Sequence, residues 1–347
     1  MIKKILLCIP SLEYGGAERV TSYLANFFSE KYIVALLTSK EKSTKEYPIR
    51  EGIQRYTTTS IKKMRRLIKD YCPDIIIIMF APMGITVVPA IAGLKIPYII
   101  SERNDPQNFA GKKITKCIYQ FYMRWASGLV FQTHEAMEYY NGKVNGKCRI
   151  IYNPLRLEGF PDIYRGERKK IIVNVGRLHY QKNQELLIRA FAKIVEKYSE
   201  YYLYIYGEGE LREQLTNLIL QLHLENKVFL MGSCSDVLYK IRDCAMFVLS
   251  SDFEGMPNAL IEALALGIPS ISTDCPCGGP RELISNHING TLIEPGNVSE
   301  LIHSMEELIC NQELCEQYTQ KSPKIREILD ENKILSEWED FCNILVK

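Results

Sequence analysis

The chain has 347 residues, of which 24% are charged and 46% are hydrophobic. This composition is ordinary for a globular protein, and the length favours two domains over one. No apolar run reaches the roughly 18 residues of a membrane-spanning helix. The eleven cysteines have no regular spacing, which favours reduced thiols over a disulfide framework or a zinc site.

The net charge of +2 conceals an uneven distribution. Residues 1–155 hold 23 Lys and Arg against 12 Asp and Glu, whereas residues 156–347 hold 20 against 29. A basic first half favours an anionic partner, such as lipid headgroups, a lipid diphosphate or nucleic acid. The alternative is that these side chains only solvate surface helices.

Short apolar runs alternate with helical patterns in the first half. Strands are expected at residues 4–9, 33–38, 74–80, 98–101, 128–132 and 149–152. The run at 74–80 is apolar on both faces, as in a strand buried within a parallel sheet. With helices expected at 17–30 and 61–69, this half predicts a β-α-β domain.

Two loops of the first half carry candidate chemistry. Gly15 and Gly16 follow the first strand, and glycine lets backbone N–H groups approach a phosphate, although a plain turn has the same pattern. Glu102 follows the strand at 98–101 and is a candidate base or partner of an acceptor hydroxyl. The alternatives there are an ion pair between Glu102 and Arg103, or a helix N-cap by the polar residues that follow.

A basic and aromatic segment spans residues 112–125. Its apolar residues fall at helical spacing, and such a helix can lie on an anionic membrane. An apolar stripe of this kind is more often the buried face of a helix that covers a sheet. We therefore expect core burial for the stripe, which includes Phe121 and Trp125, and membrane contact for the lysines.

The alternation restarts after a polar linker at 158–170. Strands are expected at 170–175, 202–206, 228–231, 246–250 and 270–273, and helices at 183–197 and 209–222. The predicted fold class is α/β, with two doubly wound Rossmann-like domains facing a cleft. The domains are residues 1–155 and 156–333, and an amphipathic helix at 334–347 is expected to pack back on the first domain.

Cationic side chains follow the first strand of the second domain. Arg177 and Lys182 lie on one loop after Gly176, and a guanidinium with an ammonium suits a diphosphate. Exposed cations are usually only solvated, but the carboxyl end of a strand is where open α/β sheets bind ligands. Gly207 ends another strand and allows either a tight turn near a nucleotide or a plain turn.

Two carboxylates eight positions apart, Glu254 and Glu262, flank the expected start of a helix. Pro257 suits its first position, and the free N–H groups behind it attract phosphate. The carboxylates would then lie on either side of a diphosphate, as a nucleotide-sugar requires. The chain has no D-x-D pair and its five histidines show no ligand spacing, so no metal site or cofactor is expected.

Together these motifs resemble the retaining glycosyltransferases of family 4, which have the GT-B fold. The resemblance spans nearly the whole chain. It implies transfer of a sugar from a nucleoside diphosphate with retained anomeric configuration, a UDP-sugar as co-substrate and no resident cofactor. The departing phosphate would help to deprotonate the incoming hydroxyl, so stabilising it would be the main catalytic contribution.

The resemblance also implies the roles of individual residues. Glu254 would hold hydroxyls of the donor sugar, Glu262 those of the ribose, and Arg177 with Lys182 the diphosphate. Many relatives carry a histidine where this chain has Ser101-Glu102-Arg103. The implied catalytic residues are Glu254, Arg177, Lys182 and Glu102. The implied donor-binding residues are Gly16, Gly176, Arg177, Lys182, Gly207, Glu254, Gly255, Met256, Pro257, Asn258, Ala259 and Glu262.

The sequences of residues 101–106 and 274–280 resemble those of one branch of the family. That branch uses UDP-linked N-acetylhexosamines or galactose to build capsule, O-antigen or lipid-linked oligosaccharides. The implied acceptor is an undecaprenyl-diphosphate-linked glycan, reached from the cytoplasm at the inner face of the cell membrane through the basic first half. The acidic second half argues against nucleic acid. Two alternatives stay open: a UDP-sugar 2-epimerase of the same fold, and a non-catalytic sugar-nucleotide binding protein.

Overall fold

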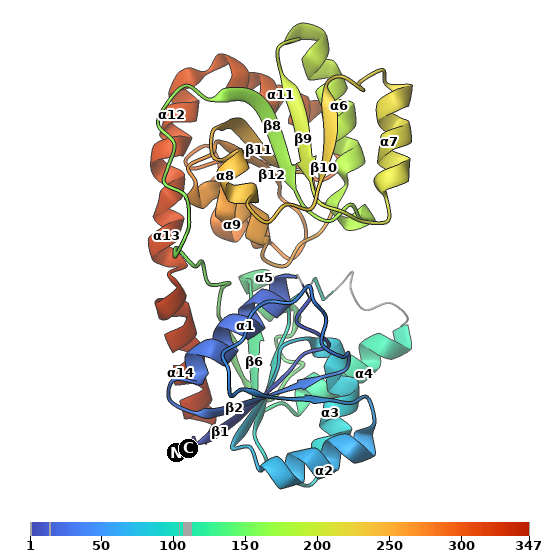
Figure 1. Cartoon of the computed structure of the whole chain (residues 1–347), viewed down its shortest axis with the longest axis vertical. Helices are drawn as coiled ribbons and strands as arrows, with labels where there is room; N and C mark the ends of the chain where they lie inside the picture. The colour runs from blue at the N-terminus through green and yellow to red at the C-terminus, as the bar shows by residue number, and fades with distance from the viewer. Residues whose placement is uncertain (1, 14, 104, 107–112, 347) are drawn as a thin grey trace. The chain divides into compact units, whose positions relative to one another are not determined.

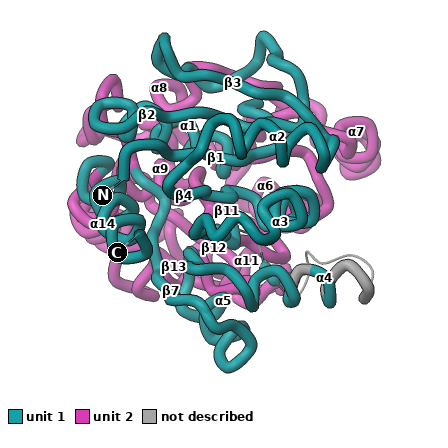
Figure 2. Tube along the Cα trace, turned by 90° about the horizontal axis from the view of Figure 1, so that it is seen from below, with its two compact units in different colours: residues 1–154, 331–347 teal, residues 155–330 magenta. Residues whose placement is uncertain are grey.

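The structure, a computed structural model, describes residues 2–13, 15–103, 105–106 and 113–346. The chain divides into two compact units, residues 1–154 with 331–347 and residues 155–330 (Figures 1 and 2). Each unit is built on a parallel β-sheet with helical crossovers, which confirms the predicted fold class of two Rossmann-like domains. None of the helices among these residues combines the length and apolarity needed to cross a membrane.

The described part of the first unit contains a seven-stranded sheet of order β3-β2-β1-β4-β5-β6-β7. Its strands are β1 (Lys4–Cys8), β2 (Ile33–Thr38), β3 (Gln54–Thr57), β4 (Ile75–Ile78), β5 (Tyr98–Ser101), β6 (Gly128–Phe131) and β7 (Lys147–Ile150). Its helices are α1 (Gly16–Phe28), α2 (Ile61–Tyr71), α3 (Gly84–Ile91), α4 (Lys113–Arg124), α5 (His134–Tyr139) and α14 (Glu331–Val346). All four isoleucines of β4 are buried, as expected for a central strand covered on both faces.

The second unit contains a six-stranded sheet of order β10-β9-β8-β11-β12-β13. Its strands are β8 (Lys169–Val175), β9 (Tyr202–Tyr206), β10 (Val228–Gly232), β11 (Cys244–Leu249), β12 (Ser270–Thr273) and β13 (Thr291–Ile293). Its helices are α6 (Gln184–Lys197), α7 (Arg212–Gln221), α8 (Val237–Ile241), α9 (Asn258–Ala265), α10 (Gly279–Leu283), α11 (Val298–Cys310), α12 (Gln312–Lys321) and α13 (Ile325–Ile328). Strand order reverses between β8 and β11, which pair in parallel.

The last helix, α14, belongs to the first unit although it follows the second in sequence (Figure 1). Trp338 and Phe341 are buried in the same core cluster as the residues of β1 and α1. Glu339 accepts hydrogen bonds from Lys31 Nζ at 2.8 Å and from Tyr32 Oη at 2.6 Å. The amphipathic pattern at the end of the chain therefore buries one face against the first sheet's helical layer.

The expected burial of the apolar stripe on α4 is wrong. Phe121 and Trp125 are 61% and 62% exposed, whereas Met123 and Ala126 are buried. Residues two positions apart project to nearly opposite sides of a helix, so the face around Met123, and not the aromatic face, packs on the unit. The lysines expected to contact a membrane lie outside the residues whose side chains the structure describes.

Candidate functional site

The candidate site of the second unit lies beyond the carboxyl ends of β8 and β11. The chain leaves β8 after Val175 and leaves β11 after Leu249, on neighbouring strands at the point where the strand order reverses. Open α/β sheets bind ligands at this switch point, because the two connections diverge there. The loop with Arg177 and Lys182 and the loop with Glu254 are thus adjacent.

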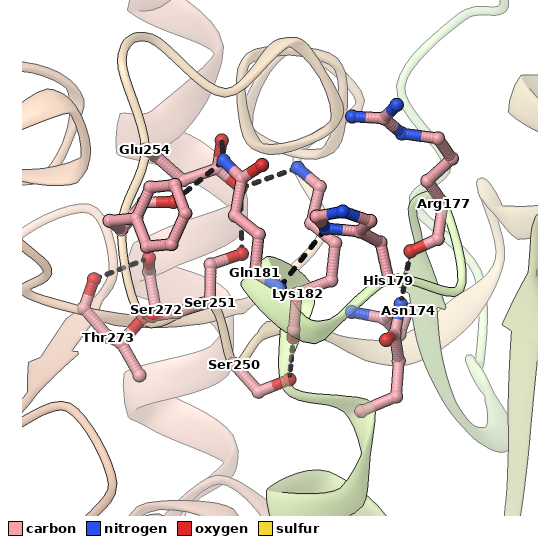
Figure 3. Close-up of polar contacts among 12 residues, drawn as sticks. Asn174, Arg177, His179, Gln181, Lys182, Ser250, Ser251, Glu254, Ser272 and Thr273 are labelled. Carbon is pink, nitrogen blue, oxygen red and sulfur yellow. Dashed lines mark hydrogen bonds and ion pairs between the residues drawn. The ribbon is translucent and has the colours of Figure 1, made fainter. Parts of the chain in front are cut away.

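An ion pair joins these two loops. Lys182 Nζ lies 2.5 Å from Glu254 Oε1, and the side chains are 18% and 8% exposed (Figure 3). Ser251 Oγ donates to the same oxygen at 2.7 Å. Gln181 Nε2 donates to Glu254 Oε2 at 3.4 Å and to the Phe253 carbonyl at 2.8 Å. The carboxylate is therefore held by side chains of both loops.

Arg177 presents a different environment. Its side chain is exposed, and its guanidinium makes no hydrogen bond to any residue that the structure describes (Figure 3). Its carbonyl accepts a hydrogen bond from Gln184 Nε2 at 2.9 Å, which fixes the backbone of the loop. The site thus offers one cation engaged with a carboxylate and one cation in contact with solvent.

Glycines allow the loops of the second unit to touch through their backbones. A Cβ on Gly207 would lie 2.0 Å from the Gly176 carbonyl oxygen, and one on Gly279 would lie 1.6 Å from that of Gly255. Both distances are far below any normal contact, so only glycine permits this packing. Gly207 thus supports the loop of Gly176 and Arg177, which is a structural role beside the predicted donor-binding one.

Residues 254–262 form the loop and helix start that the sequence predicted. Helix α9 begins at Asn258, and Pro257 is its N-cap. The sequence predicted Pro257 at the first helical position, which Asn258 occupies instead. The first N–H groups of a helix have no intrahelical acceptor, so they can bind an anion. Gly255, Met256 and Pro257 are buried, while Asn258 and Ala259 are half-buried. Glu262, on α9, is 9% exposed.

The thiol of Cys275 is affected by the Glu254 carboxylate. Burial, and then the charge of Glu254, raise the pKa of the Cys275 thiol. The thiol therefore stays neutral near pH 7, and a neutral thiol is a poor nucleophile. The arrangement favours electrostatic chemistry by Lys182 and Glu254 over covalent chemistry by Cys275.

In the first unit, Gly16 is the first residue of α1 and Gly15 is its N-cap. A Cβ on Gly15 would lie 2.3 Å from Glu18 Oε2, so the Glu18 carboxylate folds back over the glycine. Because the Glu18 side chain is flexible and the Gly15 backbone is extended, with φ at −164°, this contact does not require glycine at position 15. The role of Gly16 toward a phosphate stays a prediction.

Glu102 lies in a buried polar cluster at the carboxyl end of β5. Its Oε1 accepts the Arg103 backbone N–H at 3.1 Å, and its Oε2 accepts from Tyr140 Oη at 3.4 Å. The Arg103 guanidinium donates to Ser101 Oγ at 3.2 Å and to Asn153 Oδ1. Burial lowers the pKa of Arg103 to about 10, and Glu18 opposes this shift, so Arg103 remains charged at pH 7. A catalytic role for Glu102 stays a prediction.

The described residues contain no cluster of three or more His, Cys, Asp or Glu side chains arranged to hold a metal ion. Lys182 and Glu254 are brought together as the sequence suggested. Sequence reasoning missed Gln181 and Ser251, whose side chains complete the environment of Glu254. The available signals were a polar residue directly before Lys182 and a serine pair directly after β11.

Two family models match the chain, one for each unit. Residues 14–158 match the model described as Glycosyltransferase Family 4, and residues 158–325 match the model described as Glycosyl transferases group 1. An uncharacterised glycosyltransferase of Methanocaldococcus jannaschii is 30% identical over 284 residues, covering 75% of this chain and 68% of that protein.

A second relative matches over almost its whole length. It is an N-acetylgalactosamine-N,N'-diacetylbacillosaminyl-diphospho-undecaprenol 4-alpha-N-acetylgalactosaminyltransferase of Campylobacter jejuni, 28% identical, with 96% of this chain and 97% of that protein covered. Among solved structures, Anabaena Alr3699/HepE in complex with UDP and glucose has a TM-score of 0.86 at 17% identity, covering 99% of this chain and 100% of the other.

Proposed function

The chain belongs to glycosyltransferase family 4 and has the GT-B fold, and from this premise we propose that its second unit binds a UDP-sugar as donor. The sugar is a hexose or an N-acetylhexosamine. The single observation that carries the proposal is the ion pair between Lys182, which is partly buried, and Glu254, which is buried, at the strand switch point. Glu254 lies four residues before the start of α9.

Each group of the site has a task in this proposal. Lys182 and Arg177 neutralise the diphosphate, and the start of α9 donates backbone N–H groups to it. Glu254 accepts from hydroxyls of the sugar, and Glu262 accepts from those of the ribose. Because the Glu254 carboxylate orients Lys182, the ammonium is directed before the donor arrives, which reduces reorganisation during the reaction.

The reaction we propose retains the anomeric configuration. The bond between the anomeric carbon and the β-phosphate oxygen breaks, and the acceptor oxygen bonds to that carbon on the same face. The acceptor proton passes to the departing phosphate, so the products are the lengthened glycan and UDP. Charge develops on the phosphate in the transition state, where Lys182 and Arg177 stabilise it without a metal ion.

The proposed acceptor is a glycan linked to undecaprenyl diphosphate. The Campylobacter jejuni relative, which matches nearly end to end, acts on a diphospho-undecaprenol acceptor by its name. The net charge of +11 in residues 1–155 supports an anionic lipid surface as the place where the chain meets this acceptor. We propose that it works at the cytoplasmic face of the cell membrane, in polysaccharide or oligosaccharide biosynthesis.

Thermal unfolding with a panel of UDP-sugars tests the donor proposal. A ligand at a hundredfold excess over its Kd stabilises the folded state by about 2.7 kcal/mol, which raises the Tm measurably. We expect UDP and at least one UDP-hexose or UDP-N-acetylhexosamine to raise the Tm, and no shift with any of them would contradict the proposal. A UDP-sugar 2-epimerase would instead interconvert UDP-sugars in the absence of any acceptor.

A further inference from the structure

The two carboxylate oxygens of Glu254 have unequal environments. Oε1 accepts from Lys182 Nζ at 2.5 Å and from Ser251 Oγ at 2.7 Å, two short hydrogen bonds. Oε2 has one partner among the described residues, Gln181 Nε2, at the long distance of 3.4 Å. A carboxylate oxygen can accept two hydrogen bonds, so Oε2 retains capacity for a further donor.

The two neutral partners of Glu254 are themselves fixed. The Ser251 side chain is fully buried, and its carbonyl accepts from Thr273 Oγ1 at 2.5 Å. Gln181 Nε2 also donates to the Phe253 carbonyl at 2.8 Å, and the Gln181 carbonyl accepts from the Asp252 N–H at 2.9 Å. A carboxylate held from two directions by anchored donors has little freedom to rotate (Figure 3).

We infer that Ser251 and Gln181 are positioning residues that turn Glu254 Oε2 toward the donor sugar and so determine how well the sugar, as distinct from UDP, is recognised. The inference rests on the proposed donor site. Ser251 and Lys182 occupy Oε1, and Gln181 restrains Oε2 without saturating it. A sugar hydroxyl that donates to Oε2 then meets an oriented acceptor.

The test separates binding of the sugar from binding of the nucleotide. Kd is measured for UDP and for whichever of UDP-N-acetylgalactosamine, UDP-N-acetylglucosamine, UDP-galactose and UDP-glucose the parent binds most tightly. In Ser251→Ala and Gln181→Met we expect the UDP-sugar to bind about 3- to 10-fold more weakly, the loss of one oriented hydrogen bond. UDP itself is expected to keep its affinity within about twofold, since the hydrogen bonds that these two side chains donate go to Glu254 and to the Phe253 carbonyl.

Ser272→Ala is the matched control. Ser272 is also fully buried, and its Oγ donates to the Thr273 carbonyl at 3.0 Å, so its loss costs one buried serine hydrogen bond without touching Glu254. Its Tm reports the general cost of such a loss. If Ser272→Ala changes the ratio of UDP-sugar to UDP affinity as much as Ser251→Ala does, the positioning role is refuted.

The coupling to Glu254 gives a second criterion. In a Glu254→Ala background, Ser251→Ala is expected to cause no further change in that ratio, because the group that it orients is gone. Full additivity of the two changes would overturn the inference, as would equal weakening of UDP and UDP-sugar in Ser251→Ala. If either of these results is found and the parent protein still binds UDP tightly, only the positioning inference fails and the proposed donor site is retained. If the parent protein binds no UDP, both proposals are overturned.

Discussion

Lys182 and Glu254 are costly residues to bury. Both side chains are less than one-fifth exposed, so each has lost much of its hydration, and their mutual attraction offsets that loss only in good geometry. Ser251 and Gln181 supply the extra hydrogen bonds that make this arrangement favourable. Two charged side chains held in a fixed orientation by neutral hydrogen-bond donors are more typical of a binding site than of a structural core.

Glu262 provides the sharpest prediction at the residue level. If its carboxylate accepts from the ribose hydroxyls, Glu262→Ala removes a charge-assisted hydrogen bond worth about 1.5–3 kcal/mol. UDP should then bind roughly 10- to 100-fold more weakly, as measured by calorimetry. Glu213→Ala, a change on the exposed face of α7, is the control. Unchanged UDP affinity in Glu262→Ala would remove the ribose assignment.

The charged residues of the site were predictable from the sequence, but their neutral partners were not. Arg177, Lys182 and Glu254 stand out because they are charged and lie in the loops that follow the carboxyl ends of strands, where open α/β sheets bind ligands. Gln181 and Ser251 have no such signature, since glutamine and serine are common in any loop. Their importance depends on which two loops meet, and that follows from strand order and not from local sequence.

At the level of elements, the loops after β8, β9, β11 and β12 form one surface because their backbones touch. The Gly176 N–H donates to the Tyr206 carbonyl at 2.9 Å, which ties the loop after β8 to the end of β9. The closest approach involves Gly279, at the start of α10, against the Gly255 carbonyl. The geometry of the loop around Gly255 thus depends on a glycine 24 residues away in sequence.

Gly279→Ala tests this dependence. Its Cβ would lie 1.6 Å from the Gly255 carbonyl oxygen, so the loop of Glu254 must move. We expect a loss of about 1–3 kcal/mol in unfolding free energy, together with weaker UDP binding. Gly84→Ala is the control, because its Cβ meets nothing closer than 3.9 Å. Equal stability and equal UDP affinity in the two variants would show that the contact is unimportant.

The contacts that attach α14 to the first unit predict that the free energy of unfolding depends on pH. Burial alone would raise the pKa of Glu339, but hydrogen bonds from Lys31 and Tyr32 outweigh it and hold the pKa below its usual value. Because the pKa of Glu339 is lower in the folded state than in the unfolded state, its carboxylate stabilises the fold at pH values above the ordinary carboxyl pKa of about 4.3. This stabilisation is lost as the pH falls through the pKa of the folded state.

Glu339→Gln should therefore lower the free energy of unfolding at pH 7, by no more than about 1 kcal/mol because Lys31 is exposed. The difference from the parent should shrink as the pH falls below about 4, in urea unfolding at each pH. Asp340→Asn, an exposed change on the same helix, is the control. A deficit that stays constant with pH would contradict the ionic attachment.

Elements were predictable where burial dictates the pattern. The all-apolar β4 and the amphipathic end of the chain were clear, because both repeat one kind of side chain at a structural period. The strands β3 and β13 were missed, since they have four and three residues and are partly polar. The aromatic face of α4 was misjudged because periodicity reports which residues share a face, but not which face is covered.

At the scale of the whole molecule, positive and negative charge are separated between the two halves of the sequence. The first half carries +11 and the second −9, although the total is nearly neutral. Helix α2 alone exposes Lys62, Lys63, Arg66 and Lys69. A basic half and an acidic half suit a protein that meets an anionic surface through its first half only.

Vesicle sedimentation tests this reading. We expect binding to vesicles of phosphatidylglycerol and phosphatidylcholine, weaker at high salt, and none to phosphatidylcholine alone. Because each lysine near the surface contributes about 1 kcal/mol, the double change Lys62→Glu and Lys63→Glu should weaken binding about 30-fold or more. Lys321→Glu with Lys324→Glu makes the same change of charge in the second unit. Equal losses in the two double variants would refute a docking face on the first unit.

The most direct test of the central claim is sugar transfer itself, followed by mass spectrometry with a synthetic undecaprenyl-diphosphate-linked N-acetylhexosamine, the UDP-sugar panel and a chelator. The account predicts a product one hexose or N-acetylhexosamine heavier, one UDP released per product, and an unchanged rate in the chelator. No lengthened product with any donor, or a UDP-sugar converted into its C2 epimer without acceptor, would contradict it.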